Sequence, residues 1–383
     1  MGELGLLEAS RRSGIEGIDI LSAAPHASVY KAAGVLGLGR DSVKDIGRGG
    51  EGLPWELDLP LLGRYLSGAT AEGRNRGVIV VLNWGEVNTG KFTSGIREVR
   101  KLVDKDPKTK AWIHVDGAFG VFARMFWTED GEGNGVDERL VSLGREVDGL
   151  ECADSVTTDG HKMLNVVSSH YEHPRDGHDR LLMSDPLPQP YDCGIFFTKF
   201  PSLLNSTLSA PAPYLNPASG ADSTLSPLTL GLENSRRFRA FPVYASLVAY
   251  GASGYQQLVT TLILHARSIA SHIFNHPAYE LLPAHLFNSQ SSIDKHVFTV
   301  VLFRAKDCSL NKILKERINF GKGGKDELGG MYVSGTVWAG KPAVRIAVCN
   351  WRVEVGEDGV GGWGGVRTLL DRVSTEWEVG QRG

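Results

Sequence analysis

The segment Asp154–Met163, DSVTTDGHKM, decides how the chain is organised. Its β-like run Ser155–Thr158 leads into a Gly-His-Lys turn that ends in Lys162. Upstream, the apolar segment Ala111–Asp116 ends in a carboxylate. Ligands of α/β folds bind beyond the carboxyl ends of the strands. The pattern therefore predicts one site that contains both Lys162 and Asp116.

A lysine amine and a carboxylate in these positions suit pyridoxal 5'-phosphate. The aldehyde of this cofactor forms a Schiff base with a lysine, and an acid keeps its ring nitrogen protonated. Burial lowers the pKa of a lysine and makes its amine nucleophilic. Two other interpretations stay open from the residues alone. Lys162 could be a solvated surface lysine, and Asp116 could cap the helix that follows it.

Apolar segments alternate with helical patterns along the first part of the chain. This alternation predicts parallel βαβ units, and right-handed crossovers place the loops after the strands at one edge of the sheet. His26, Glu86, Asp116 and Lys162 all fall in such loops. The expected strands are Ile18–Ala23, Val78–Trp84, Ala111–Asp116, Ser155–Thr158 and a last core strand Gly194–Thr198, and the expected helices are Val29–Gly37, Leu59–Gly73, Ile96–Lys105 and Val136–Val147.

The remainder of the chain has a different pattern. Ser235–His272 predicts one or two long helices, and an amphipathic helix is expected at the C-terminus. Between them the pattern predicts a small α+β domain with an antiparallel sheet. We therefore expect a large domain over residues 1–280 and a small C-terminal domain over residues 281–383. The elements expected in the small domain are the strands Val297–Arg304, Tyr332–Val337 and Ala343–Val348 and the helix Leu310–Ile318.

Composition limits the possible partners and compartment. The net charge of −3 gives no basic surface for nucleic acid. No run of the sequence is long and apolar enough to span a bilayer, and the first residues do not form a signal peptide. The cysteines are scattered without a CxxC pair, which favours reduced thiols in a cytoplasmic protein over disulfides or zinc. They are Cys152, Cys193, Cys308 and Cys349.

Five segments together resemble the group II pyridoxal-phosphate-dependent amino-acid decarboxylases, which include the glutamate and aromatic-L-amino-acid decarboxylases. The resemblance runs from about Gly5 to about Val353. It implies the aspartate-aminotransferase-like α/β fold (PLP fold type I), with a three-layer large domain and a mainly parallel sheet. It also implies a homodimer and a carboxy-lyase that converts an L-amino acid to the amine and CO₂. The segments are HVDGAFG (114–120), NTG (88–90), TTDGHKMLN (157–165), PYDCG (190–194) and SRRFRAFPVYASL (235–247).

By position, the resemblance assigns cofactor contacts to four residues. Lys162 would form the Schiff base, and Asp116 would pair with the pyridinium nitrogen. His26 would stack on the ring and take part in catalysis, and Ala118 would pack against the opposite ring face. From the residues alone, His26 could also be a hydrogen-bonded loop histidine.

Three further residues match positions around the cofactor or the substrate. His161 would lie near the phosphate. Glu86 occupies the position that approaches the phenolic edge, where many members of the family carry Thr. Arg345 matches a basic position that meets the substrate carboxylate in relatives, although a structural ion pair would give the same pattern.

The chain departs from the family pattern in several places. The family's phosphate-binding loop and N-terminal dimerising segment have no match in this sequence. The pattern of LLEASRR (6–12) is typical of the middle of a helix. We therefore expect an N-terminally truncated chain. The proton-donor Tyr of relatives also has no match. Met163 stands where Trp is common, and Thr93 stands where Asp is common.

The segment Val167–Gln189 interrupts a run that is continuous in relatives. It is polar and contains proline, so it predicts a loop or disorder. Removing it restores LNVPYDCG, and we hypothesise a retained intron. Its histidines fit no standard zinc spacing, so no metal site is predicted. They are His170, His173 and His178.

Two rivals to decarboxylation remain open. One is another reaction at the same carbanion, such as oxidative deamination or aldol cleavage. The other is a non-catalytic fragment or pseudoenzyme of the same family.

Overall fold

The computed structural model describes residues 3–68, 75–106, 110–129, 135–164, 193–209, 230–233, 235–321, 332–349 and 364–382. The predicted insertion Val167–Gln189 lies outside the described residues, as do the first three residues of the PYDCG motif. Among the described residues, no helix has the length and apolar character needed to cross a membrane.

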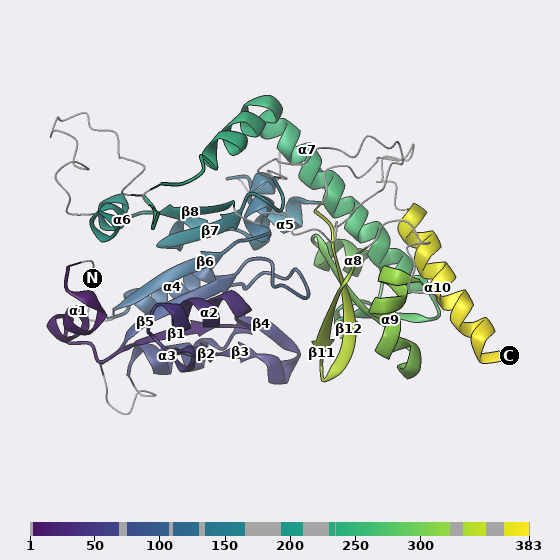
Figure 1. The fold of residues 1–383 in the computed structure, drawn as a ribbon, viewed down its shortest axis with the longest axis horizontal. Coiled ribbons are helices and arrows are strands. Elements are labelled where there is room, and N and C mark those ends of the chain that lie inside the picture. The colour runs from purple at the N-terminus through teal and green to yellow at the C-terminus, as the bar shows by residue number, and fades with distance from the viewer. Residues whose placement is uncertain are drawn as a thin grey trace.

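A mainly parallel sheet of six strands forms the larger part of the molecule (Figure 1). Its order is β2-β1-β5-β6-β7-β8, and only β8 runs antiparallel to its neighbour. This confirms the predicted α/β class. The strands are β1 (Ile18–Ser22), β2 (Val43–Asp45), β5 (Gly77–Asn83), β6 (Ala111–Asp116), β7 (Ser155–Asp159) and β8 (Gly194–Thr198).

The two faces of this sheet differ in chemistry. One face carries Val80, Leu82, Ile113 and Val115 into the main core. The opposite face is apolar over β1 and β5, where α2 (Ala27–Val35) covers it. Over β6 and β7 that same face becomes polar, and we call this part the polar face. It consists of His114, Asp116, Ser155, Thr157 and Asp159.

The prediction of Gly194–Thr198 as a core strand is wrong. The strand β8 pairs with β7 at the edge of the sheet, and Phe196 and Phe197 remain 49% and 56% exposed. An apolar sequence alone does not distinguish a central strand from an edge strand. In the described part of the chain only β7 pairs with it, so both phenylalanines keep contact with solvent.

Two predicted helices are shorter than expected. The helix α3 (Leu59–Leu66) ends before Gly68, whose φ of 73° is left-handed. The helix α5 (Val141–Glu146) starts later than predicted because Asp137 closes a turn by accepting the N–H of Leu140. The other elements of this part are α1 (Gly5–Ser13), η1 (Arg40–Ser42), β3 (Gly47–Arg48), η2 (Gly49–Glu51), β4 (Leu53–Leu57), α4 (Ile96–Asp104), η3 (Gly120–Phe126), η4 (Leu150–Cys152) and α6 (Pro201–Leu208).

A second sheet lies beyond the carboxyl edge of the first. Its order is β11-β12-β10-β9, and every pairing in it is antiparallel, as predicted for the C-terminal part. The strand β9, which is the first of these four in the sequence, was not predicted. The domain boundary after residue 280 stays a prediction. The elements are β9 (Tyr279–Leu282), η7 (Ala284–Leu286), α8 (Gln290–His296), β10 (Val300–Ala305), α9 (Cys308–Phe320), β11 (Ser334–Trp338) and β12 (Lys341–Ala347).

The long helix α7 (Ala240–Asn275) connects the two parts (Figure 1). It is interrupted at Gly251, whose φ is 61° and ψ is −176°. The segment after Gly251 is packed into the core through Val259, Leu262 and other apolar residues. The segment before it leaves Tyr244 67% exposed. The helix therefore has one half in the core and one half on the surface.

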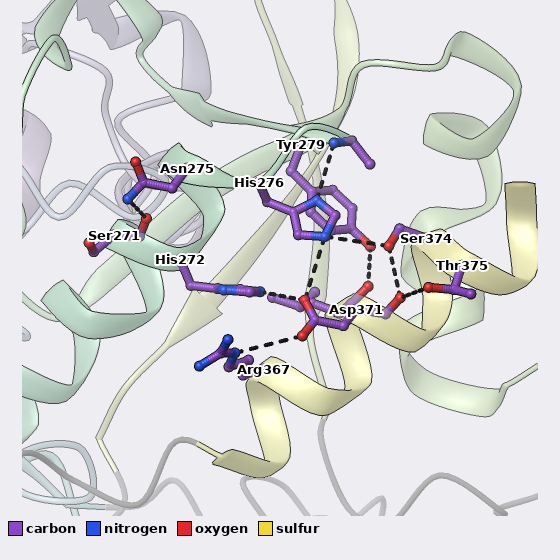
Figure 2. A network of polar contacts seen from close by, with 11 residues as sticks. Ser271, His272, Asn275, His276, Tyr279, Arg367, Asp371, Ser374 and Thr375 are labelled. Atoms are coloured by element: carbon purple, nitrogen blue, oxygen red, sulfur yellow. Dashed lines mark hydrogen bonds and ion pairs between the residues drawn. The ribbon is translucent and has the colours of Figure 1, made fainter.

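The C-terminal helix α10 (Gly364–Arg382) is held against α7 by a polar network (Figure 2). Asp371 lies 2.8 Å from Nε2 of His272 and 3.5 Å from Nε2 of His276. The Tyr279 hydroxyl donates to the Leu370 carbonyl at 2.8 Å. Polar and apolar contacts together thus fix the end of the chain onto α7.

Tyr279→Phe is expected to lower the free energy of unfolding by about 1 kcal/mol, because it removes a buried hydrogen bond while keeping the ring. Tyr279 is 1% exposed. Denaturant unfolding of the variant and the parent measures the difference. Tyr244→Phe is the matched control and should change stability by less than about 0.5 kcal/mol. An equal decrease in the free energy of unfolding in the two variants would contradict a stabilising role of the hydrogen bond from Tyr279 to Leu370.

A lysine–histidine contact joins the loop after β5 to the end of α8. Lys91 Nζ lies 3.0 Å from Nδ1 of His296. Burial, and then the charge of Lys91, lowers the pKa of His296 from 6.5 to about 4. In the unfolded chain His296 takes up its proton near its ordinary pKa of 6.5. The unfolded state therefore binds more protons between pH 6.5 and pH 4, and the folded state loses stability as the pH falls through that window.

We expect His296→Asn to flatten this pH dependence, because an amide cannot take up the proton. Melting temperatures of parent and variant at pH 7 and pH 5 test the expectation. The melting temperature of the parent should fall more between pH 7 and pH 5 than that of the variant. An identical loss in both proteins would show that His296 does not titrate in this window.

Candidate functional site

Lys162 lies on the turn that follows β7. Its Nζ is 2.8 Å from Oδ2 of Asp159 and 4.3 Å from the centre of the Phe119 ring, and its side chain is 25% exposed. The turn requires glycine at position 160, because a Cβ there would lie 2.7 Å from Sγ of Cys193. The amine is therefore fixed by a carboxylate and an aromatic ring while a molecule from solvent can still reach it.

Asp116 ends the neighbouring strand β6 on the polar face. It pairs in register with Thr157, two residues before Asp159. Its Oδ1 accepts the N–H of Ala118 at 3.3 Å. The short helix η3 begins after Phe119 and has no side-chain cap, so Asp116 is not its N-cap. The structure thus removes the capping interpretation and leaves a half-buried carboxylate beside the β7 turn.

His114 lies behind Asp116 on the same face. Its Nδ1 is 2.8 Å from Oγ of Ser155, and its Nε2 is 3.2 Å from Oγ1 of Thr157. Burial lowers the pKa of His114, and the Asp116 charge opposes that shift. A neutral, doubly hydrogen-bonded imidazole therefore supports the strand end that carries Asp116.

Asp159 is a site residue whose role the sequence analysis did not identify. Its Oδ2 contacts Lys162 and lies 3.8 Å from Nε2 of His161. The available signal was its position three residues before Lys162, on a turn that brings both side chains to the same side. One carboxylate thus lies between two basic groups that were both assigned to the site.

His26 lies at the same sheet edge but apart from Lys162. It is exposed and caps α2, where its Nδ1 accepts the Ser28 N–H at 3.3 Å. Its strand β1 is separated from β6 by β5, a distance of about 10 Å at ordinary strand spacing. Asn83 fixes this loop by donating from Nδ2 to the carbonyls of Ala23 and Ala24, at 2.6 Å and 3.1 Å.

Asn83 is a second residue that the sequence analysis did not assign. It ends β5 and pairs in register with Asp116. Its Oδ1 is buried and has no hydrogen-bond partner in the part of the chain that the structure describes. The signal was a single amide at the end of the apolar run Val78–Trp84.

Glu86 and Arg345 come together in the loop after β5. Both oxygens of the buried Glu86 accept hydrogen bonds from Asn88 and Thr89, at 2.8 to 3.0 Å. Arg345, on β12, donates from Nη1 to the Val87 carbonyl at 2.7 Å. Burial lowers the pKa of Arg345, and the Glu86 charge opposes this shift. The pair holds the second sheet against this loop.

The second sheet also approaches Lys162. Cys349 follows β12 and is half-buried; burial raises the pKa of its thiol, and the charge of Lys162 acts in the opposite direction. Lys162 therefore lies between the carboxyl edge of the first sheet and the end of β12. Ala118 is half-buried on the same side, next to Asp116.

His272, His276 and Asp371 are close enough in space to suggest a metal site. However, Nδ1 of His276 accepts the Ala278 N–H at 3.1 Å, which puts the ring proton on Nε2, facing Asp371. A metal-bound histidine instead donates from its other nitrogen. This trio thus connects two helices by close contacts between the histidines and the Asp371 carboxylate. The histidines of the insertion, at positions 170, 173 and 178, lie outside the described residues.

Comparisons with known proteins agree with the motifs. No family model matches the chain. It is 26% identical over 256 residues to L-2,4-diaminobutyrate decarboxylase of Rhizobium meliloti (strain 1021), covering 66% of this chain and 42% of that protein. It is 22% identical over 367 residues to tyrosine decarboxylase 4 of Petroselinum crispum, covering 92% of this chain and 57% of that protein. The chain thus spans about half the length of these curated relatives.

The fold is also shared with solved structures. The TDC of Oryza sativa, solved with PLP and tryptamine, superposes with a TM-score of 0.67 at 18% identity, covering 96% of this chain and 65% of that one. The six-stranded and four-stranded sheets therefore form the aspartate-aminotransferase-like fold that the motifs predicted. The curated proteins that the chain matches are amino-acid decarboxylases, in agreement with the resemblance to the group II pyridoxal-phosphate-dependent family that the motifs indicate.

Proposed function

We propose that this protein binds pyridoxal 5'-phosphate through Lys162 and converts an L-amino acid to the amine and CO₂. The observation that carries the proposal is the position of one amine and one carboxylate. Lys162 follows β7 and Asp116 ends the adjacent parallel strand, so both groups lie at one edge of the sheet. The names of the curated relatives support the reaction class.

The residues of the polar face fit this cofactor. The Lys162 amine must leave Asp159 and lose its proton before it can bond to an aldehyde, and Asp159 remains nearby as the charge partner of His161. Asp116 would hold the proton of the ring nitrogen. When bound, the cofactor supplies an electron-poor ring that accepts the electron pair left by the departing carboxylate.

The other proposed cofactor contacts come from loops at the same edge of the sheet. His26 would stack on the ring from the loop that Asn83 fixes, with Ala118 on the other ring face. His161 would lie near the phosphate. Glu86 would act through its loop, because its carboxylate is already hydrogen-bonded there.

Arg345 would meet the substrate carboxylate from the second sheet. Its guanidinium already reaches the loop that carries Glu86, which supports a place at the rim of the site. Residues 281–383 would then form the small domain that covers the cofactor edge of the large domain, residues 1–280.

We also propose a homodimer in the cytoplasm. The exposed first half of α7 supports an interface, because Phe241, Tyr244 and Val248 are 59%, 67% and 67% exposed. The cysteines among the described residues are free thiols, as expected in a reducing compartment.

The test begins with covalent labelling of the full chain. After addition of pyridoxal 5'-phosphate and borohydride reduction, peptide mass spectrometry should place the cofactor on Lys162. Lys162→Ala should lose the label and the release of CO₂ from a carboxyl-labelled amino acid. Lys199→Ala, at the exposed end of β8, is the matched control and should keep both. A label on another lysine would contradict the assignment of Lys162.

Asp116→Asn should keep the label but slow CO₂ release by about a hundredfold or more, because an amide does not stabilise a protonated ring nitrogen. Product analysis in the same assay distinguishes the amine from an aldehyde. A labelled parent protein that releases neither product would favour the pseudoenzyme hypothesis.

A further inference from the structure

A cavity of about 230 Å³ is enclosed by β4, the loop after β5, α5, η7 and α8. Its apolar wall consists of Leu53, Trp55, Phe92 and Leu286. The polar residues that line it are Lys91, Glu146, His296, Ser94 and Glu56, and the Glu56 carboxylate already accepts hydrogen bonds from Ser94. None of the residues assigned to the cofactor lines this cavity. Its volume corresponds to about eight water molecules, so it can hold a molecule of similar size, such as a small amino acid.

Lys91 presents unused hydrogen-bond donors to this cavity. It is 8% exposed, and burial lowers the pKa of its amine. Its Nζ contacts only Nδ1 of His296 among the described residues, and His296 is neutral near pH 7 because its pKa is about 4. An ammonium has three donors, so two remain available.

Glu146 presents an unused acceptor. Burial raises the pKa of its carboxyl, and the charge of Lys91 opposes that shift. Glu146 is half-buried, and among the described residues its carboxylate has no hydrogen-bond donor and no ion-pair partner. Buried charges are normally paired and hydrogen-bonded. Here Lys91 and the half-buried Glu146 line one cavity without forming an ion pair, while the other carboxylate, Glu56, is hydrogen-bonded to Ser94.

We propose that this cavity binds a small amino acid as its zwitterion. Its carboxylate would bind Lys91, its ammonium would bind Glu146, and its side chain would lie against Trp55, Phe92 and Leu286. One molecule with both charges would satisfy both residues, whereas an anion or a cation would leave one of them without a partner.

The occupant would act on the loop of the cofactor site. The Lys91 carbonyl accepts the N–H groups of Gly85 and Glu86, at 3.2 Å and 2.8 Å. A ligand that fixes Lys91 would therefore also fix the Glu86 loop, which Arg345 contacts. This second site would be regulatory, and its existence does not depend on the reaction proposed above.

Equilibrium dialysis tests the proposal with the full-length Lys162→Ala protein, without cofactor, so that only this cavity is probed. The probes are glycine, L-valine and L-leucine. For the best of them we expect saturable binding. With L-leucine, the analogues 4-methylpentanoate and 3-methylbutylamine should bind at least about tenfold more weakly, because each lacks one charge.

Two variants in the Lys162→Ala background locate the site. Lys91→Met and Glu146→Gln should each weaken binding at least about tenfold. Lys91→Met should also remove the preference for L-leucine over 3-methylbutylamine. Lys295→Met, which removes a nearby charge outside the cavity, is the control and should bind normally. Circular dichroism checks that each variant is folded, and Glu146→Gln keeps the size of the side chain.

Absence of saturable binding for all three probes at millimolar concentration would overturn the proposal and would leave a water-filled cavity as the explanation. Binding that both variants leave unchanged would overturn it as well. Because the tested protein lacks Lys162, neither outcome bears on the proposed decarboxylation.

Discussion

The parallel register of β5, β6 and β7 is the constraint on which the site depends. It places Asn83, Asp116 and Thr157 in one row across three strands. The loops that follow these strands then carry Glu86, Ala118 and Lys162 to one edge. Without this alignment, a lysine and a carboxylate more than forty residues apart in sequence would not lie at the same edge of the sheet. The apolar face beneath fixes the register, because a slip by one residue would turn Ile113 and Val115 out of the core.

The sheet changes character within a single face. Over β1 and β5 it buries apolar side chains under α2, and over β6 and β7 it carries hydroxyl, imidazole and carboxylate groups that are buried or half-buried. These polar groups are stabilised by hydrogen bonds to one another, as the contacts of His114 with Ser155 and Thr157 show. The structure thus combines a rigid apolar half with a polar half that can contact a ligand.

Much of the fold could be predicted because the central strands are continuous apolar runs. The strands β5 and β6 were predicted within a residue, whereas β2 and β9 are too short to give a periodic signal. The edge position of β8 could not be predicted, since it depends on which strands pair. The roles of Asp159 and Asn83 were missed for a related reason. Their partners are defined by turn geometry and register rather than by residue type.

Lys162 and Lys91 differ in their exposure and in the charge of their contact partners. Lys162 is paired with Asp159 at 2.8 Å and keeps a quarter of its side chain exposed, so its charge is balanced and a reactant can reach it. Lys91 is buried against a neutral histidine, and the carboxylate of Glu146 lines the same cavity without contacting it. Burial without a direct ion pair is costly. The cost is tolerable where a ligand or water completes the contacts, which is why the cavity and the unpaired charges occur together.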